Sequence, residues 1–268
     1  MSDQRPIGIF DSGLGGLTVA NAVNHQLPNE QMVYFGDSAH LPYGDKSAAT
    51  IQAYSIKICD VLLEKNCKLV LVACNSASAA AFELMKAYVG SKAKVFNVID
   101  PVVEYVSNHY SGKKVGLIGT KQTVGSGVYE YQIKVKDPSI SFSALATPLL
   151  VPMIEEGFHD DNISEAIIEQ YLKDPALKDI DALILGCTHY PLIKPEINKF
   201  YQSEVEVIDS SLIVAEALEK YLEQEGISAE KRINDHHFLV SDITPSFEKA
   251  AELFFGQKVP LEKHILWE

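Results

Sequence analysis

Short runs of apolar residues alternate along the chain with longer segments in which Ala, Leu, Lys and Glu recur at helical spacing. The runs of the first half are PIGIF, MVYFG, KLVLVAC and KVFNVID, and those of the second half are KVGLIG, ISFSALA, DALILGC and VEVID. Apolar runs of this length, separated by helices, are typical of strands that a parallel sheet buries on both faces. The pattern therefore predicts an α/β protein.

The order of elements is repeated, which indicates a duplication. Four pairs of matching positions are separated by offsets of 108, 109, 113 and 109 residues. These pairs are Ile9 and Leu117, Phe35 and Ala144, Cys74 and Cys187, and Asp100 and Asp209. We expect two pseudo-symmetric lobes, residues 1–100 and 101–209, each a mostly parallel sheet flanked by helices. Because ligands bind beyond the carboxyl ends of parallel strands, the active site is predicted in the cleft between the lobes.

Residues 210–268 have no counterpart in the first half. The run LIVAEALEKYLEQEG has the pattern of an amphipathic helix that ends at Gly226. HHFLVSD has the pattern of one more strand. We expect this tail to pack back onto the first lobe, and the alternative is a small independent appendage.

Composition narrows the possible classes of protein. The 268 residues are 47% apolar and 22% charged, with a formal net charge of −13. This acidic balance, without a basic patch, argues against a nucleic-acid partner. The N-terminus has no leader pattern, and no apolar run approaches the roughly 20 residues that span a bilayer, so we expect a cytoplasmic protein with no membrane partner. The four cysteines form no C-x-x-C pair, which argues against a disulfide framework or a structural zinc site.

Two cysteines occupy equivalent places in the two halves. Cys74 ends LVLVAC and Cys187 ends ALILGC, each at the junction between a strand and the next helix. Helix N–H groups at such a junction favour a thiolate. Cys59 and Cys67 lie in a segment predicted to be helical, and we interpret them as buried, inert thiols.

One thiol on each side of a cleft is the arrangement needed to invert a stereocentre. A base removes the α-proton from one face of the substrate while a conjugate acid delivers a proton to the other. This chemistry needs no cofactor if fixed dipoles in a dry site stabilise the carbanionic transition state. No pattern in the sequence favours a pyridoxal lysine or a metal, and we expect neither.

Four motifs resemble those of the glutamate racemases, members of the aspartate/glutamate racemase family. They are DSGLGG at 11–16, PYG at 42–44, CNSAS at 74–78 and GCTHYP at 186–191. The resemblance implies a two-lobed α/β fold, cofactor-independent interconversion of L- and D-glutamate, supply of D-glutamate for peptidoglycan, and a homodimer. Thr188-His189 favours glutamate, since aspartate racemases usually have Thr-Glu there. Ser76 is a departure, since the family more often has Thr.

The resemblance also implies roles for residues beside the two cysteines. Asp11 assists proton transfer near Cys74, while Glu155 assists on the Cys187 side, with its neighbour Glu156 as the alternative. His189 is placed to orient or ionise Cys187. The remaining residues are predicted to bind substrate, together with Asp11 and His189: Ser12, Tyr43, Gly44, Asn75, Ser76 and Thr188.

Each of these residues also has an ordinary structural interpretation. Asp11, Ser12, Asn75, Ser76 and Thr188 could simply cap helices, and PYG could simply form a turn. For Asp37, His40 and the pair His236-His237 the sequence indicates no role beyond surface or packing.

Three other functions remain open from the sequence. DSGLGG followed by Asp37 is similar to a dinucleotide-binding fingerprint, although its third glycine would fall on Thr18. A thiol hydrolase could use Cys187 and His189, although residues two apart at a helix start rarely point at each other. A non-catalytic binder of acidic amino acids would use the same cleft and helix termini, and its ligand affinity would survive replacement of both cysteines.

Overall fold

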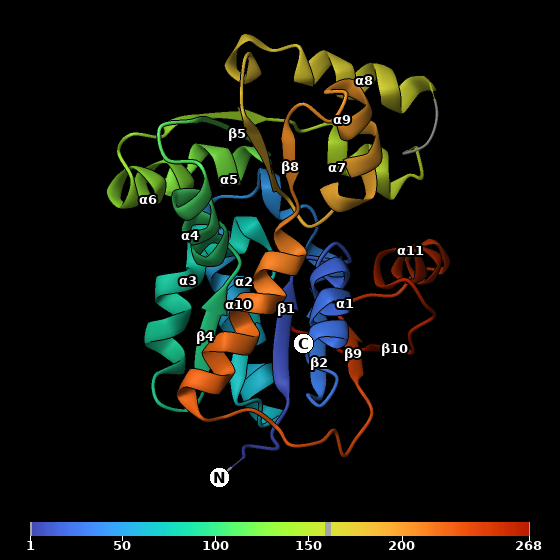
Figure 1. The fold of residues 1–268 in the computed structure, drawn as a ribbon. Helices are drawn as coiled ribbons and strands as arrows, with labels where there is room; N and C mark the ends of the chain where they lie inside the picture. Colours follow the sequence, from blue (N-terminus) through green and yellow to red (C-terminus); the bar gives the residue numbers. More distant parts are fainter. Residues whose placement is uncertain (1, 159–161, 268) are drawn as a thin grey trace.

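The computed structural model describes residues 2–158 and 162–267 and shows two lobes, each built on a parallel sheet (Figure 1). Within these residues, a six-stranded sheet has the order β10-β9-β2-β1-β3-β4 and a four-stranded sheet has the order β6-β5-β7-β8. The predicted α/β class with two similar lobes is confirmed.

The strands of the first sheet are β1 (Ile7–Asp11), β2 (Met32–Gly36), β3 (Leu69–Val72), β4 (Lys94–Asn97), β9 (His237–Val240) and β10 (Leu261–Lys263). Those of the second sheet are β5 (Lys114–Gly119), β6 (Ser141–Ala146), β7 (Ala182–Gly186) and β8 (Glu206–Ile208). The α-helices are α1 (Leu17–Gln26), α2 (Ala48–Glu64), α3 (Asn75–Val89), α4 (Ile99–His109), α5 (Lys121–Gly125), α6 (Val128–Lys136), α7 (Leu150–Glu155), α8 (Asn162–Leu172), α9 (Lys194–Phe200), α10 (Ser210–Glu225) and α11 (Pro245–Phe255). Short 3₁₀ turns are η1 (Ser38–His40), η2 (Tyr43–Asp45), η3 (Pro175–Leu177) and η4 (Tyr190–Ile193).

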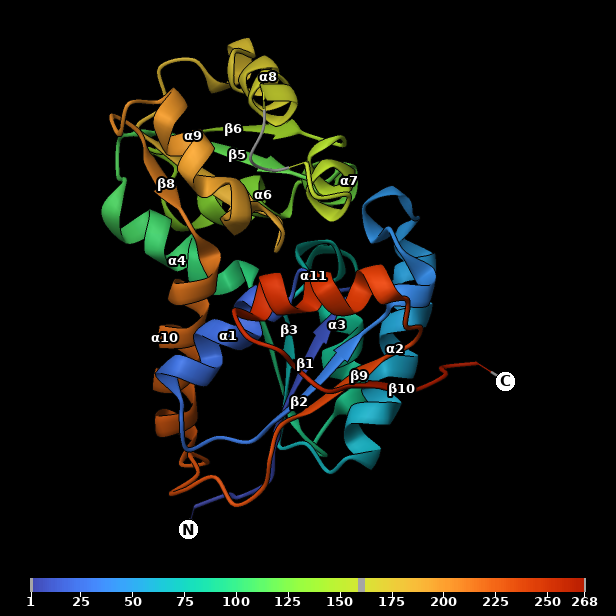
Figure 2. The same cartoon turned by 90° about the vertical axis from the view of Figure 1, so that its right-hand side faces the viewer.

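Helices cover both faces of the first sheet (Figure 2). Ile7 and Ile9 of β1 face a core that includes residues of α1 and α10. Phe10 of the same strand faces the other core, which includes residues of α2 and α3. Because side chains alternate along a strand, burial on both sides explains why the strands are continuous apolar runs.

The second sheet repeats the order of the first, with β6-β5-β7-β8 in place of β2-β1-β3-β4. Ile9 pairs with Tyr34 and Leu117 with Ala144, so Tyr34, not Phe35, is equivalent to Ala144. The alignment of the two cysteines agrees with the register of β3 and β7.

The fourth aligned pair, Asp100 and Asp209, was also wrong in the structure. Phe96 lies opposite Leu71 and Ile208 opposite Ile184, which makes Asn97 the equivalent of Asp209. Asn97 Oδ1 accepts hydrogen bonds of 2.8 Å from the N–H groups of Ile99 and Asp100, and Asp209 Oδ1 accepts one of 2.8 Å from Ser211. Sequence alignment matched the two acidic residues, whereas the side chains at the equivalent positions both accept from N–H groups at the start of the next helix.

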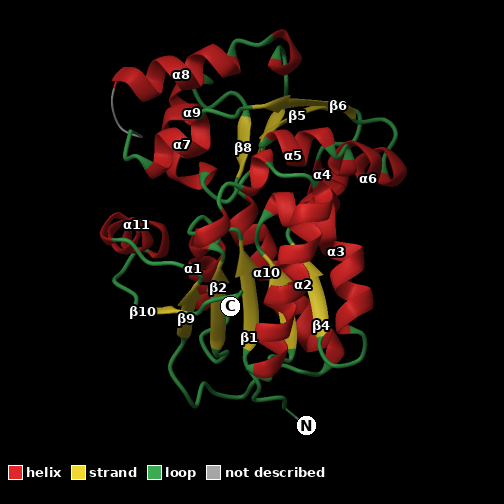
Figure 3. Ribbon diagram, turned by 180° about the vertical axis from the view of Figure 1, so that it is seen from behind, coloured by secondary structure: helices red, strands yellow, loops and turns green. Residues whose placement is uncertain are grey.

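The tail adds to the first sheet. β9 pairs with β2, β10 pairs with β9, and α10 and α11 both contact α1 (Figure 3). α10 ends at Glu225 and is capped by Gly226, whose φ of 66° is the left-handed conformation that favours glycine. The limits of the lobes at residues 100 and 209 stay a prediction.

Two further features bear on the sequence expectations. Cys59 lies in α2, but Cys67 follows that helix in the turn before β3, so its helical assignment was wrong. Within residues 2–158 and 162–267, no helix is long and apolar enough to cross a bilayer.

Candidate active site

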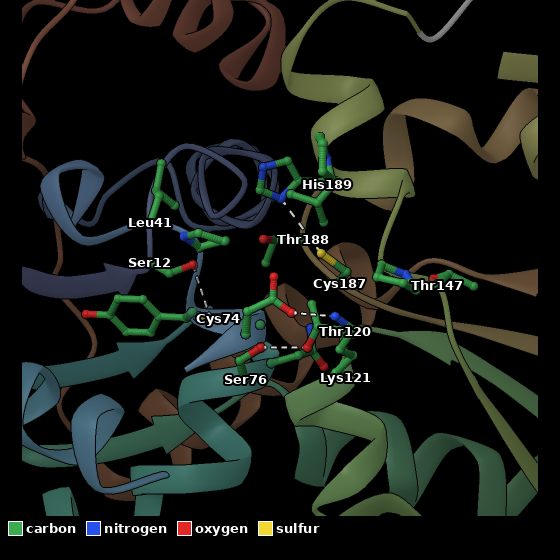
Figure 4. A pocket seen from close by; sticks show the side chains of 18 of the residues that line it. Ser12, Leu41, Cys74, Ser76, Thr120, Lys121, Thr147, Cys187, Thr188 and His189 are labelled. Atoms are coloured by element: carbon green, nitrogen blue, oxygen red, sulfur yellow. Dashed lines mark hydrogen bonds and ion pairs between the residues drawn. The ribbon is translucent and has the colours of Figure 1, made fainter. Parts of the chain in front are cut away.

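A cavity of about 280 Å³ lies between the lobes, where β1, β3 and β7 end. Ser12 and Cys74 contribute to it from the first lobe, and Cys187 and His189 from the second (Figure 4). Among the residues predicted to form the site, Asp11 is the one that does not line this cavity. The others do: Ser12, Tyr43, Gly44, Cys74, Asn75, Ser76, Glu155, Cys187, Thr188 and His189.

Cys74 is the N-cap residue of α3. Its Sγ accepts a hydrogen bond of 3.4 Å from the N–H of Ala77 and donates one of 3.4 Å to Ser12 Oγ. Burial and the charge of Asp11 raise the pKa of this thiol to about 12, against weaker opposition from these hydrogen bonds. Cys74 is therefore protonated at neutral pH, with donors in place for a thiolate that forms during a reaction.

Asp11 lies beneath the glycine-rich turn and is fully buried. Its Oδ2 accepts a hydrogen bond of 2.9 Å from the N–H of Gly13. Burial raises the pKa of this carboxyl, and the turn N–H groups and His189 oppose the shift. A Cβ on Gly16 would lie 2.4 Å from Asp11 Cβ, so this position needs glycine.

Cys187 follows β7 directly and has a different environment. Its Sγ lies 3.7 Å from His189 Nδ1, and His189 Nε2 lies 2.8 Å from Glu155 Oε1. Burial lowers the pKa of His189, but its hydrogen bonds with Cys187 and Glu155 outweigh that effect and raise the pKa to about 10. Cys187 thus has an imidazolium beside it at neutral pH.

The expectation that Cys187 and His189 would not point at each other was wrong. The Tyr190 N–H donates to the Cys187 carbonyl oxygen at 3.1 Å, and this tight turn just before η4 brings the His189 ring back to the sulfur. Phe254 of α11 packs edge-to-face against the His189 ring, with centroids 5.1 Å apart. Glu155 makes the contact to His189, whereas Glu156 is exposed and does not line the cavity.

Asn75 and Ser76 begin α3 at the cavity. Asn75 Oδ1 accepts a hydrogen bond of 2.7 Å from the Tyr129 hydroxyl, while its buried Nδ2 has no partner among the described residues. Ser76 Oγ lies 2.9 Å from Thr120 Oγ1. An unpartnered donor and a hydroxyl cluster at a helix N-terminus suit a carboxylate.

Thr188 and the glycine-rich turn join the lobes. The Thr188 carbonyl oxygen accepts a hydrogen bond of 3.0 Å from Thr18 Oγ1. A Cβ on Gly15 would lie 2.3 Å from Thr188 Oγ1 and 2.4 Å from His189 Nδ1. This turn therefore packs against the second lobe and does not present the open concave surface of a pyrophosphate site, which weakens the dinucleotide hypothesis.

Tyr43 and Gly44 form one wall of the cavity. The Tyr43 hydroxyl donates a hydrogen bond of 2.6 Å to Asp37 Oδ2, and a Cβ on Gly44 would lie 2.8 Å from Thr120 Cβ. The surface and packing interpretation of Asp37 thus missed a contact with a cavity residue. His236 does pack, since its Nδ1 accepts from the Met32 N–H at 3.1 Å.

Sequence reasoning missed several residues that line the cavity: Leu41, Pro42, Asp45, Thr120, Lys121, Thr147, Pro148, Val151, Pro152 and Gly186. The duplication of the two lobes could have indicated two of these residues, Thr120 and Thr147. Thr120 follows β5 as Ser12 follows β1, and Thr147 N–H donates to Gly119 O at 2.9 Å as Asp37 N–H donates to Asp11 O at 3.0 Å.

Charged groups at the cavity belong to two pairs. Lys121 Nζ of the second lobe lies 3.0 Å from Asp45 Oδ1 of the first, and His189 contacts Glu155. In the described part of the chain, no group of three or more His, Cys, Asp or Glu side chains is arranged to hold a metal ion.

A two-lobed α/β fold with one thiol from each lobe at a shared cavity defines the class of the aspartate and glutamate racemases. Residues 14–218 match the Asp/Glu/Hydantoin racemase family, and the chain belongs to this family. It is an isomerase of the racemase type.

Individual relatives match over nearly the full length. The chain is 37% identical to a glutamate racemase of Chlorobaculum parvum, with 97% of this chain and 96% of the relative covered. It is 40% identical to that of Aquifex pyrophilus, with 96% of each covered. The crystal structure of glutamate racemase from Francisella tularensis in complex with D-glutamate has a TM-score of 0.92 at 38% identity, with 98% of each chain covered.

Proposed function

We propose that the protein is a cofactor-independent glutamate racemase that interconverts L- and D-glutamate with Cys74 and Cys187 as its two bases. The observation that carries the proposal is a single cavity lined by one thiol from each lobe. The names of the relatives and the neighbour's D-glutamate complex support glutamate as substrate. By family resemblance, the product supplies peptidoglycan synthesis in the cytoplasm and the enzyme is a homodimer.

The two sulfurs begin a turnover in different protonation states. Burial keeps Cys74 a thiol, and the His189 imidazolium, paired with Glu155, lies beside the Cys187 sulfur that acts as the base. The Cys187 thiolate removes the Cα proton from one face, and the Cys74 thiol delivers its proton to the other. Cys187 then carries the proton and Cys74 the negative charge, which is the state that accepts the opposite enantiomer.

Other residues bind the substrate and stabilise the new charge. The unpartnered Asn75 Nδ2 and the α3 N-terminus bind the α-carboxylate, with Ser76 and Thr188 beside them. Ser12 and the Ala77 N–H stabilise the thiolate that forms at Cys74. Asp11, next to this sulfur but outside the cavity, acts through the turn that holds Ser12.

The test is incubation of the reduced protein with L-glutamate in D₂O. We expect loss of optical rotation together with deuterium at Cα, because the proton delivered comes from a thiol that exchanges with solvent. A parallel incubation with L-aspartate measures how strongly the enzyme prefers glutamate, whose side chain is one methylene longer. A difference of one methylene corresponds to about 1–3 kcal/mol of discrimination between the two substrates. A folded sample without exchange on either amino acid would refute the proposal, whereas exchange on aspartate alone would refute the substrate.

A further inference from the structure

The segment that follows β2 is tied to the C-terminal tail at the end of β9. Ser38 Oγ donates to the carbonyl oxygen of Asp242 at 2.6 Å, and the Asp242 N–H donates to Ser38 Oγ at 2.8 Å. Ser241 Oγ accepts from the Ala39 N–H at 2.8 Å and donates to Asp37 Oδ1 at 2.7 Å. Residues 37–45, which we call the substrate loop, are thus fastened to the tail shortly before they reach the cavity.

Asp37 connects this fastening to the cavity wall. Its side chain is fully buried, with Ser241 and His40 on Oδ1 and the hydroxyl of Tyr43 on Oδ2. A buried carboxylate is stable only while its oxygens keep their donors. The position of Tyr43 therefore depends on groups that hold Asp37, and one of them comes from the tail.

The described residues of the second lobe show no such arrangement. Thr147 takes the place of Asp37 there, and its hydroxyl lies 2.7 Å from that of Tyr190 within the same lobe. The Asp37 carboxylate and the Ser241 hydroxyl that holds it are thus both found on the lobe that supplies the substrate loop.

We propose that Ser241 is a positioning residue of the active site, which acts through Asp37 to hold Tyr43 and Gly44 against the cavity. This inference rests on the proposed racemase function. Ser241 does not line the cavity and takes no part in proton transfer. Without its hydroxyl, the Ala39 N–H loses its acceptor and Asp37 loses a donor, so the substrate loop loosens while the two thiols keep their places.

The experiment compares KM and kcat of the S241A variant with those of wild type for L-glutamate. We expect KM to rise about tenfold, the effect of one lost buried hydrogen bond to a charged group, with kcat changed less than twofold. Ser55 is the matched control, because it is a fully buried serine of the same lobe whose hydroxyl donates to the Ile51 carbonyl oxygen at 2.7 Å, away from the cavity. S55A should keep the wild-type KM.

A double variant separates positioning from general weakening. If Ser241 acts through Tyr43, S241A/Y43F should raise KM no more than Y43F alone, and S241T, which keeps a hydroxyl, should restore part of the wild-type KM. A wild-type KM in S241A, or additive effects in the double variant, would overturn the inference.

Amide hydrogen exchange keeps this inference separate from the proposed function. In S241A, residues 38–45 should exchange at least tenfold faster than in wild type and S55A. If the wild-type protein showed no racemisation, the proposed function would fail, and unchanged protection of the substrate loop in S241A would refute the positioning role on its own.

Discussion

Substitution of Gly15 by alanine should damage catalysis without touching either cysteine. The added Cβ would lie 2.3 Å from Thr188 Oγ1 and 2.4 and 2.6 Å from His189 Nδ1 and Cε1, where ordinary contacts begin at 3.4 Å. Both neighbours are buried, so one side of the interface must retreat by about 1 Å. A misplacement of about 1 Å near reacting groups lowers the rate about 100-fold, or about 2.7 kcal/mol.

The assay measures kcat/KM for racemisation and the melting temperature of G15A. Overpacking of a buried contact adds a loss of about 1–3 kcal/mol in the free energy of unfolding. Gly125 is the control, since a Cβ there meets nothing within 4 Å and G125A should keep wild-type activity. If G15A retained more than half of the wild-type kcat/KM, the close approach of the turn to the Cys187 side would not matter for catalysis.

His189, Asn75 and Lys68 each depend on a contact that a single substitution removes. His189, with a pKa raised to about 10, should lose its proton and the activity above that pH, and a pH profile of H189Q without this alkaline limb would agree. Its contribution to stability, complete below about pH 6.5, should fall between about pH 6.5 and about 10 and be absent above that pH. N75A removes the free Nδ2 donor and should lower kcat/KM about 10- to 100-fold in steady-state assays, while an unchanged value would contradict carboxylate binding there. K68M leaves Glu30, whose Oε2 lies 2.7 Å from Lys68 Nζ, buried without this positive charge and with the Ala229 N–H on Oε1; urea titration should show a loss of about 3–5 kcal/mol with wild-type kcat in the folded fraction.

The fold could be predicted because burial on both faces leaves a plain trace in the sequence. Strands β1, β2 and β3 consist of apolar residues and glycine, apart from the terminal Asp11, and every residue in them is buried. The equivalence of positions between the two sheets was harder to predict from the sequence, because Phe35 and Tyr34 are both buried and either fits an apolar pattern. Only the hydrogen-bonded pairing identifies Tyr34 as the counterpart of Ala144.

The lining of the cavity was predictable where residues follow a strand directly and less so elsewhere. Cys74, Cys187 and Asn75 could be placed at the cavity because the end of a parallel strand fixes where the next residues lie. Lys121 and Val151 come from helices and line the cavity only because of how the lobes pack. The contact of Ser241 with Asp37 joins positions 204 residues apart, and no local pattern indicates it.

The most direct measurement compares the two cysteine-to-serine variants in D₂O, each with L-glutamate and with D-glutamate. Because each thiol serves one face of the substrate, C74S and C187S should each incorporate deuterium at Cα from one enantiomer much faster than from the other, with opposite preferences. Equal exchange from both enantiomers by both variants, or the same preference in both, would contradict a mechanism with one base on each face.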